Sequence, residues 1–372
     1  MHTIRFLLVL LQHKGKLMAT GRTRIKDIAM IAGVSVGTVD RVLHNRPNVS
    51  QKARQKVENA LREMDYSPNI YASVLAYNKE YSFHLIMPQH ESEAYWQEIE
   101  VGALAAIDRR RDFHLGIEIK HYERLNSSSF SKTTGESIEG KPDAVVVVPT
   151  TLEETKEFTD MLHSMGIPFV LLDSYMPDLK PLSFFGQDSF NSGVFAARML
   201  MLMAARETEV MIMKQMRGGM LYSKQQENRE RGFRHYMIEH FPRVVISELD
   251  LPLDNDSGEY DKLLDGFFAA HPNVHHCITF NSKAHIVGEY LQRTNRRDIQ
   301  IMGYDMVPKN AECMRNGSIS FLIAQHAYMQ GFSCIESLFR AIVLKKEVTP
   351  VNYMPIELLS KENIDFYRRM QL

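Results

Sequence analysis

Two short amphipathic segments separated by a glycine occupy residues 24–45 and strongly limit how this part of the chain can fold. Apolar residues recur in the first segment with the spacing of one helix face: Ile25, Ile28, Ala29 and Ala32. Gly33 can adopt the left-handed conformation with which helices end, and Ser35 is a preferred N-cap for a second helix. So short a turn predicts either an ordinary helical hairpin or a helix-turn-helix, which lays its second helix in the DNA major groove.

The second helix is expected to bury Val36, Val39 and Leu43. If its outer face meets DNA, the contacting residues are Ser35, Val36, Gly37, Thr38, Asp40, Arg41 and His44. A carboxylate is repelled by phosphates, so we expect Asp40 either to accept a hydrogen bond from a cytosine amino group or to pair with Arg41.

A third helix is predicted from about Ser50, its cap, to Met64, followed by a break before Pro68. A short helical stretch then covers residues 70–76. The whole run resembles the DNA-binding headpiece of the lactose-repressor/galactose-repressor family of bacterial transcription regulators. The matching residues are DIA (27–29), AGVS (32–35), TV (38–39), RVL (41–43), Val49-Ser50, Arg54, Val57, Y-x-P-N (66–69) and A-x-x-L-A (72–76).

The resemblance implies a sequence-specific regulator, most simply a repressor, that binds a palindromic operator in double-stranded DNA as a homodimer. It also implies that residues 70–76 form a hinge helix, with Asn69, Ala72 and Leu75 adding DNA contacts and the leucine entering the minor groove. Charge agrees with this partner. Residues 22–79 carry ten Lys or Arg and five Asp or Glu, whereas the whole chain has a formal net charge of −1.

Beyond residue 79 the sequence alternates between apolar, strand-like runs and helical patterns. The predicted strands are 82–87, 116–121, 144–148, 169–172, 210–214, 244–248, 276–280, 300–304 and 321–324. The predicted helices are 95–111, 153–165, 189–205, 225–239, 258–271, 283–293 and 330–343. Repeated βα units predict doubly wound parallel sheets, and nine strands are too many for one compact sheet of this type.

We therefore expect an all-α helix-turn-helix headpiece at residues 24–79 and an α/β effector domain at 81–372. The second domain should have two doubly wound, parallel-sheet lobes with a ligand cleft between them. The expected first lobe covers about 81–205 and 326–345, and the second about 208–324 and 346–372.

This region resembles the type I periplasmic-binding-protein fold used as an effector domain. The landmarks are GIPFVLLDS (166–174), QD (187–188) with SG (192–193), RERGF (229–233), FN (280–281), MGYD (302–305), and Gln325 followed by Gly331. The resemblance implies a small-molecule effector, a sugar or sugar derivative, because amides, carboxylates and arginine suit a polyol. The implied effector-binding residues are Tyr95, Trp96, Asp188, Arg229, Asn281, Asp305 and Gln325. Two structural readings remain open, with Asp305 as a strand-end cap and Trp96 as part of a lobe core.

Other classes of protein fit less well. The sequence contains no HExxH, G-x-S-x-G, P-loop or GxGxxG motif, so we expect no enzyme and no cofactor. Three cysteines without paired spacing indicate a reducing compartment and no metal site. Residues 1–17 read as a misassigned start or an extension rather than an export signal, which favours a cytoplasmic protein without a membrane partner. The alternative is a solute-binding protein or an enzyme on the same two-lobed α/β fold.

Overall fold

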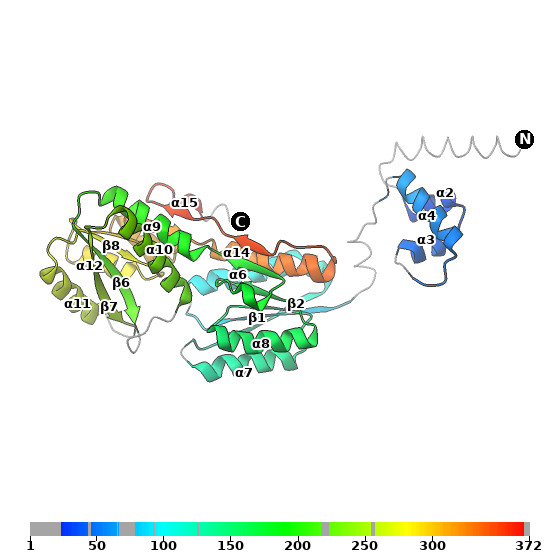
Figure 1. Cartoon of the computed structure of the whole chain (residues 1–372), viewed down its shortest axis with the longest axis horizontal. Coiled ribbons are helices and arrows are strands. Elements are labelled where there is room, and N and C mark those ends of the chain that lie inside the picture. The colour runs from blue at the N-terminus through cyan, green and yellow to red at the C-terminus, as the bar shows by residue number, and fades with distance from the viewer. Residues whose placement is uncertain are drawn as a thin grey trace, which may run out of the picture. The chain divides into compact units, whose positions relative to one another are not determined.

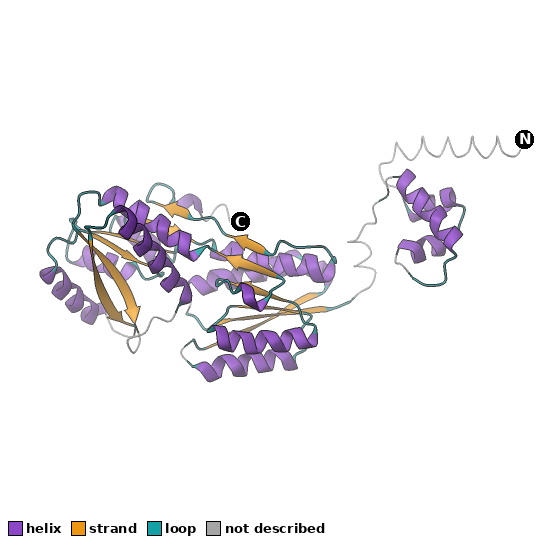
Figure 2. Ribbon diagram, viewed as in Figure 1, coloured by secondary structure: helices purple, strands orange, loops and turns teal. Residues whose placement is uncertain are grey.

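The computed structural model describes residues 24–43, 46–64, 66, 79–91, 94–124, 126–216, 223–253 and 257–367 (Figures 1 and 2). The chain divides into two compact units, residues 1–77 and 78–372. Several predictions concern residues outside the described ranges: the extension at 1–17, His44, Asn69, Ala72, Leu75 and the hinge helix at 70–76. Among the described helices, none combines the length and apolar character needed to cross a bilayer.

The first unit contains three helices around one small core: α2 (Ile25–Ala32), α3 (Val36–Leu43) and α4 (Gln51–Glu63). Gly33 ends α2 with φ of 63°, and the Ser50 hydroxyl accepts from the Ala53 amide at the start of α4, as predicted. The buried side chains come from all three helices: Ile28, Ala29, Ala32, Val39, Val42, Val57 and Ala60.

One prediction about the second helix of this unit is wrong. Val36 is 44% exposed and Leu43 is only partly buried, while Val42 is buried beside Val39. Because Val36 is the first residue of α3, its side chain projects from the helix end and does not lie between the helices. The buried residues of α3 are therefore Val39 and Val42, and not the predicted Val36, Val39 and Leu43.

The second unit contains two six-stranded sheets, of which the first is entirely parallel. Its strand order is β11-β5-β4-β3-β1-β2. The strands are β1 (Tyr81–Pro88), β2 (Leu115–Tyr122), β3 (Ala144–Val147), β4 (Phe169–Leu172), β5 (Ser183–Gly186) and β11 (Val351–Tyr353). Helices α6 (Tyr95–Arg109) and α14 (Ala327–Leu338) cover one face, and α7 (Ser127–Glu139) and α8 (Leu152–Met165) cover the other (Figure 1).

The second sheet has the order β12-β10-β9-β8-β6-β7 and is parallel except for β12. Its strands are β6 (Glu209–Met216), β7 (Val245–Pro252), β8 (His276–Thr279), β9 (Gln300–Tyr304), β10 (Phe321–Ala324) and β12 (Glu357–Leu359). Helices α9 (Ser189–Met203) and α10 (Lys224–His240) pack on one face. Helices α11 (Ser257–Ala270), α12 (His285–Arg293) and α13 (Pro308–Asn316) pack on the other. Each sheet is thus covered on both faces, as the alternating pattern predicts.

All nine predicted strands and all seven predicted helices of this unit are present, with small shifts at their ends. The sequence did not predict β5, β11, β12, α7 or α13. Four short helical segments complete the described chain: Arg111–Phe113, Pro177–Leu179, Phe339–Val343 and Ile364–Tyr367.

The division between the two lobes differs from the expected boundaries at two places. Helix α9 was expected in the first lobe, but its buried side chains pack with β6, β8 and α10 of the second. Strand β11 was expected in the second lobe, but it pairs with β5 of the first. The described chain therefore passes between the lobes after β5, after β10 and between β11 and β12.

Two helix pairs lie so close that their backbones touch, one pair in each lobe. A Cβ atom on Gly102 of α6 would meet the Tyr328 carbonyl oxygen on α14, and one on Gly331 would meet the Ile99 carbonyl oxygen. Gly193 of α9 and Gly232 of α10 stand in the same relation to the carbonyl oxygens of Arg229 and Phe190. Glycine is required at these crossings for space rather than for its backbone freedom.

Candidate functional site

In the first unit, α3 and the residue before it present polar groups at the surface, from Ser35 to Arg41 in the last turn. Ser35, Gly37 and Arg41 are exposed. The Thr38 amide donates to the Ser35 hydroxyl oxygen at 3.2 Å, and the two hydroxyls lie 2.9 Å apart, so Ser35 caps α3 as predicted. Asp40 forms an ion pair with Arg46 at 3.2 Å, a partner that the sequence did not suggest. This surface of α3 has the exposed hydrogen-bonding side chains that base edges require.

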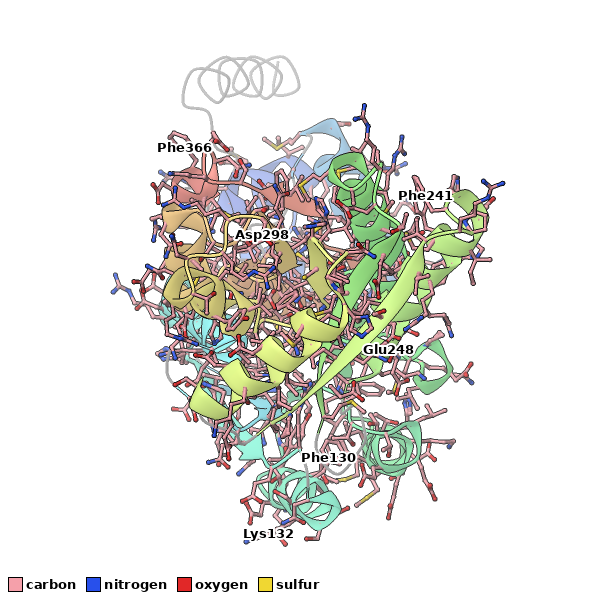
Figure 3. The ribbon with its side chains drawn as sticks, turned by 90° about the vertical axis from the view of Figure 1, so that its left-hand side faces the viewer. Phe130, Lys132, Phe241, Glu248, Asp298 and Phe366 are labelled. Carbon is pink, nitrogen blue, oxygen red and sulfur yellow. The ribbon has the colours of Figure 1, made fainter. Side chains whose placement is uncertain are left out.

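In the second unit, a cavity of about 1030 Å³ opens where strands β2, β3 and β4 of the first lobe end. The second lobe contributes residues from the start of α9 and the start of α10. Phe130 of α7, labelled in the lower part of Figure 3, lines the side of the cavity that belongs to the first lobe. The position agrees with the rule that ligands bind at the carboxyl ends of parallel strands.

The cavity wall combines hydrogen-bonding groups with apolar rings. Its carboxylates are Glu123, Glu154, Asp173, Asp178, Asp188 and Glu227. Its amides are Asn126, Gln187, Gln225 and Asn228, and its cations are Arg124 and Lys224. Its larger apolar side chains are Phe130, Leu152, Tyr175, Met176, Phe190 and Tyr353. Such a wall can bind the hydroxyls of a polyol and cover its C–H faces.

Of the predicted effector-binding residues, Asp188 lines this cavity. Its carboxylate caps α9, accepting from the Asn191 amide at 3.0 Å and from the Asn191 side chain at 2.7 Å. Asp188 lies at the point where the chain first passes from β5 to the second lobe. A ligand that contacts Asp188 therefore contacts a connection between the lobes.

Four other predicted residues come together in a buried, hydrogen-bonded network beside the cavity: Tyr95, Arg229, Asp305 and Gln325. Arg229 is 1% exposed and donates to the Phe280 carbonyl oxygen at 2.8 Å and to the Gln325 side-chain oxygen. The Gln325 amide donates to Asp305 at 2.7 Å. Tyr95, Asp305 and Gln325 also line a second space of about 30 Å³, the size of a single water molecule.

Arg229 is held from several sides. Its guanidinium lies 4.1 Å from the centre of the Tyr304 ring, within the range of a cation–π interaction. Within the part of the chain that the structure describes, its buried Nε has no hydrogen-bond partner. The guanidinium thus retains one unused donor in a site where most polar groups are paired.

Burial raises the pKa of Asp305 to about 6, and the nearby Arg229 charge partly opposes this shift. Burial also raises the pKa of Tyr95 well above its ordinary value, and the neighbouring Asp173 adds to the effect. Asp305 and Asp173 each follow a strand, with φ of 66° and 72°. Non-glycine residues rarely adopt such values, and strained backbone of this kind concentrates at ligand sites.

The remaining predicted residues lie at the margin of this arrangement. Trp96 is half-buried, with the Arg124 guanidinium 4.7 Å from its ring centre, and Arg124 lines the cavity. The Asn281 side-chain oxygen accepts from the Lys283 amide at 2.9 Å, so it orders the turn between β8 and α12. Its amide group lies 3.5 Å from the Gln226 side-chain oxygen.

Sequence reasoning missed three residues that connect the network to the cavity or complete it: Asp173, Gln225 and Gln330. Asp173 accepts from the Tyr95 hydroxyl at 3.1 Å, and the Gln330 amide donates to that same hydroxyl at 3.1 Å. Asp173 could have been chosen from the sequence, because it directly follows the apolar strand in GIPFVLLDS just as Asp305 follows the strand in MGYD. Gln225 lies one turn before Arg229 on α10, which is a second usable signal.

Comparison with known proteins adds independent findings. The family described as "Periplasmic binding protein domain" matches residues 83–347, and "Bacterial regulatory proteins, lacI family" matches residues 24–69. A crystal structure of a candidate LacI transcriptional regulator from Bacteroides fragilis has 45% sequence identity and a TM-score of 0.75. It covers 78% of this chain and 100% of its own.

Two curated proteins are more distant. The HTH-type transcriptional regulator DegA of Bacillus subtilis is 28% identical over 254 residues, which is 66% of this chain and 70% of DegA. The ribose operon repressor of Lactococcus lactis is 23% identical over 359 residues, which is 91% of this chain and 99% of that protein.

Proposed function

As a member of the lacI family of bacterial regulatory proteins, this chain is a transcription regulator, and we propose that it acts as a homodimer on a palindromic operator under the control of a sugar-like effector. The observation that carries the effector proposal is the cavity of about 1030 Å³, to which both lobes contribute carboxylates or amides. The proposed role of the protein is to couple occupation of this cavity to operator affinity.

DNA recognition is assigned to the exposed surface of α3. We propose that Ser35, Gly37, Thr38 and Arg41 contact base edges or phosphates in the major groove, with Val36 packing on a base and Asp40 contributing through its pairing with Arg46. The exposed Val36 supports this role, because an apolar side chain at the tip of α3 suits the thymine methyl group. In a dimer, two copies of α3 would read half-sites about one helical turn apart.

The effector is proposed to be a sugar or sugar derivative, for chemical reasons. Each lining carboxylate accepts hydrogen bonds and each lining amide both donates and accepts, so the wall can satisfy several hydroxyls at once. Tyr175, Phe190 and Tyr353 offer apolar faces for C–H groups. One relative is named as a ribose operon repressor, so its name refers to an operon for a sugar.

The predicted residues are proposed to act in two ways. Asp188 binds the effector directly from the cavity wall. Arg229, Asp305, Gln325 and Tyr95 act through Asp173 and Gln225, which line the cavity and also bond to the network. Trp96 and Asn281 complete the site from its margin. An effector that accepts a hydrogen bond from Gln225, or donates one to Asp173, would rearrange the contact between the lobes.

The test combines a binding screen with a DNA assay. A thermal-shift screen of sugars, sugar phosphates and uronates should find a compound that raises the melting temperature, since ligand stabilisation follows RT ln(1 + [L]/Kd). A gel shift with genomic fragments should find an operator, and the same compound should change its midpoint. The proposal fails if no fragment is retained specifically, or if the stabilising compound leaves operator affinity unchanged.

A further inference from the structure

Two histidines and one glutamate meet on the first lobe, away from the polar network described above. His90 follows β1, His121 lies on β2 and Glu100 lies on α6. The Glu100 Oε2 atom is 3.0 Å from His90 Nε2 and 3.1 Å from His121 Nε2. The three candidate ligand atoms lie within 4.8 Å of one another. Two strands and a helix thus bring three metal-ligating side chains to one point.

The orientation of His90 determines which of its nitrogens is available. His90 Nδ1 lies 3.0 Å from the Glu91 carbonyl oxygen, which can only accept, so Nδ1 carries the proton. In the neutral ring, Nε2 then presents a lone pair toward the Glu100 carboxylate, which is also an acceptor. Two facing acceptors repel unless a positive species lies between them. A backbone carbonyl that fixes the tautomer in this way is the usual outer contact of a metal-bound histidine.

The distances fit a shared ion. Zinc binds imidazole nitrogen and carboxylate oxygen at about 2.0–2.2 Å, so two ligands of one tetrahedral ion lie about 3.3 Å apart. The two N–O distances are within a few tenths of an ångström of that value. The imidazole rings stand edge to face with their centres 5.4 Å apart, and the His121 ring is exposed.

We propose that His90, Glu100 and His121 bind a divalent transition-metal ion, with zinc as the ion that this ligand set suits best. Three protein ligands leave one coordination position open, and the exposure of His121 lets water or another ligand reach it. The bound ion would link His90, just after β1, to α6, the helix that begins at Tyr95 of the polar network.

The competing explanation is a single proton between His90 and Glu100, with His121 donating to the same carboxylate through Nε2 as a neutral ring. Direct titration with Zn²⁺ separates the two explanations. No sequence pattern indicates the site, because Glu100 is 10 residues from His90 and 21 from His121, outside the short spacings typical of zinc motifs.

The position of the site provides a direct readout. Trp96 is the only tryptophan, and it lies one helical turn before Glu100 on α6. Tag-free, full-length protein is stripped with a chelator and titrated with Zn²⁺ by calorimetry. It is titrated separately with Co²⁺, following visible absorption and Trp96 fluorescence. We expect one ion per site, a tetrahedral Co²⁺ spectrum, quenching of Trp96, and release of Co²⁺ by Zn²⁺.

Three ligand variants and one control complete the test: His90→Ala, His121→Ala, Glu100→Gln and His271→Ala. His271 also pairs with a carboxylate, Glu209 at 2.7 Å, but within the described residues Glu209 forms no ion pair with a second histidine. Each ligand variant should lose about 100-fold or more in Zn²⁺ affinity, while His271→Ala binds normally. Glu100→Gln keeps the shape of the side chain, so its loss of binding cannot be attributed to misfolding. Equal Zn²⁺ affinity in wild type and His121→Ala, or Co²⁺ binding that leaves Trp96 fluorescence unchanged, would overturn the proposal.

Discussion

The side-chain amide of Gln225 donates to the Asp173 carboxylate at 3.1 Å, joining α10 of the second lobe to the end of β4 in the first. The same amide lies 3.1 Å from the Gln325 side-chain oxygen. Gln225 and Asp173 both line the large cavity. A ligand in that cavity therefore competes for groups that also hold the two lobes together.

Replacing Gln225 should weaken this connection. Gln225→Ala leaves the buried Asp173 carboxylate without one donor, which should lower the free energy of unfolding by about 1–3 kcal/mol. The midpoint of the effector response in a gel shift should move as well. Gln292→Ala is the control, because Gln292 is an exposed glutamine on α12 that does not line the cavity. An effector response identical in both variants would contradict the assigned role of Gln225.

Arg229→Ala should abolish the effector-induced change in operator affinity while DNA binding survives. The guanidinium orients Gln325 and sits over Tyr304, whereas the headpiece has its own core and does not depend on Arg229. Gel shifts with and without effector measure both properties. Arg234→Ala is the control, because Arg234 lies on the same helix but pairs with Glu230 and Glu248, which do not line the cavity, and it should respond normally. If Arg229→Ala and Asp305→Ala both respond with normal midpoints, the effector-site assignment is wrong.

The stability of the effector domain should depend on the protonation of Asp305. Its folded pKa of about 6 lies above its ordinary value of 3.8, so the folded state holds this proton more tightly. The contribution of Asp305 is therefore most favourable below about pH 4 and is lost as the pH rises through about 6. Asp305→Asn removes this dependence. The unfolding free energy of wild type relative to Asp305→Asn should fall by about 3 kcal/mol between about pH 4 and pH 7, at about 1.4 kcal/mol per pKa unit.

Gly102→Ala should be strongly destabilising, because the new methyl group would overlap the Tyr328 carbonyl oxygen where α6 and α14 touch. We expect a loss of about 1–3 kcal/mol or more, as for other overpacked sites. The control is Gly135→Ala in α7, where a Cβ would meet nothing within 4 Å. That change should raise stability by about 0.5–1 kcal/mol. If the helix contact is as described, urea denaturation should show a lower free energy of unfolding for Gly102→Ala and a higher one for Gly135→Ala than for the wild type.

Arg41→Ala should weaken specific operator binding by about 1–3 kcal/mol if Arg41 contacts a base. Arg62→Ala is the control, since Arg62 lies on α4 and its guanidinium donates to the Asn59 side-chain oxygen at 2.6 Å. Footprinting with wild-type protein should reveal an imperfect palindrome. Protection of a single asymmetric half-site would rule out the dimer.

The parts of the fold that sequence patterns predicted are those with long, regular periodicity. The apolar run of β3 and the capped helices α2 and α4 follow directly from local rules. Strands β11 and β12 are three residues each and only half-buried, so they carry no period to detect. Helix α7 was missed because its serines and threonines favour other conformations. Helix α13 had detectable signals, with Pro308 at its start and Gly317 at its end.

The residues of the candidate site also differ in how clearly the sequence indicates them. Arg229, Asp305 and Gln325 lie on different elements, and the resemblance to a family brought them together before any geometry was known. Gln330 could not be chosen from the sequence, because a buried glutamine without a nearby motif is recognised only by its partners. The His90, Glu100 and His121 cluster depends on the parallel pairing of β1 with β2, which places distant residues side by side.

Because the chain passes repeatedly between the lobes, the parts of this protein should fold at different times during translation. Strand β11, at residues 351–353, completes the edge of a sheet that begins at residue 81. The first lobe cannot acquire its last strand until almost the whole chain has left the ribosome. Helices α2 to α4, in contrast, are contiguous and can fold as soon as they emerge. During translation, the nascent chain should therefore hold a finished headpiece before it holds a finished sensor.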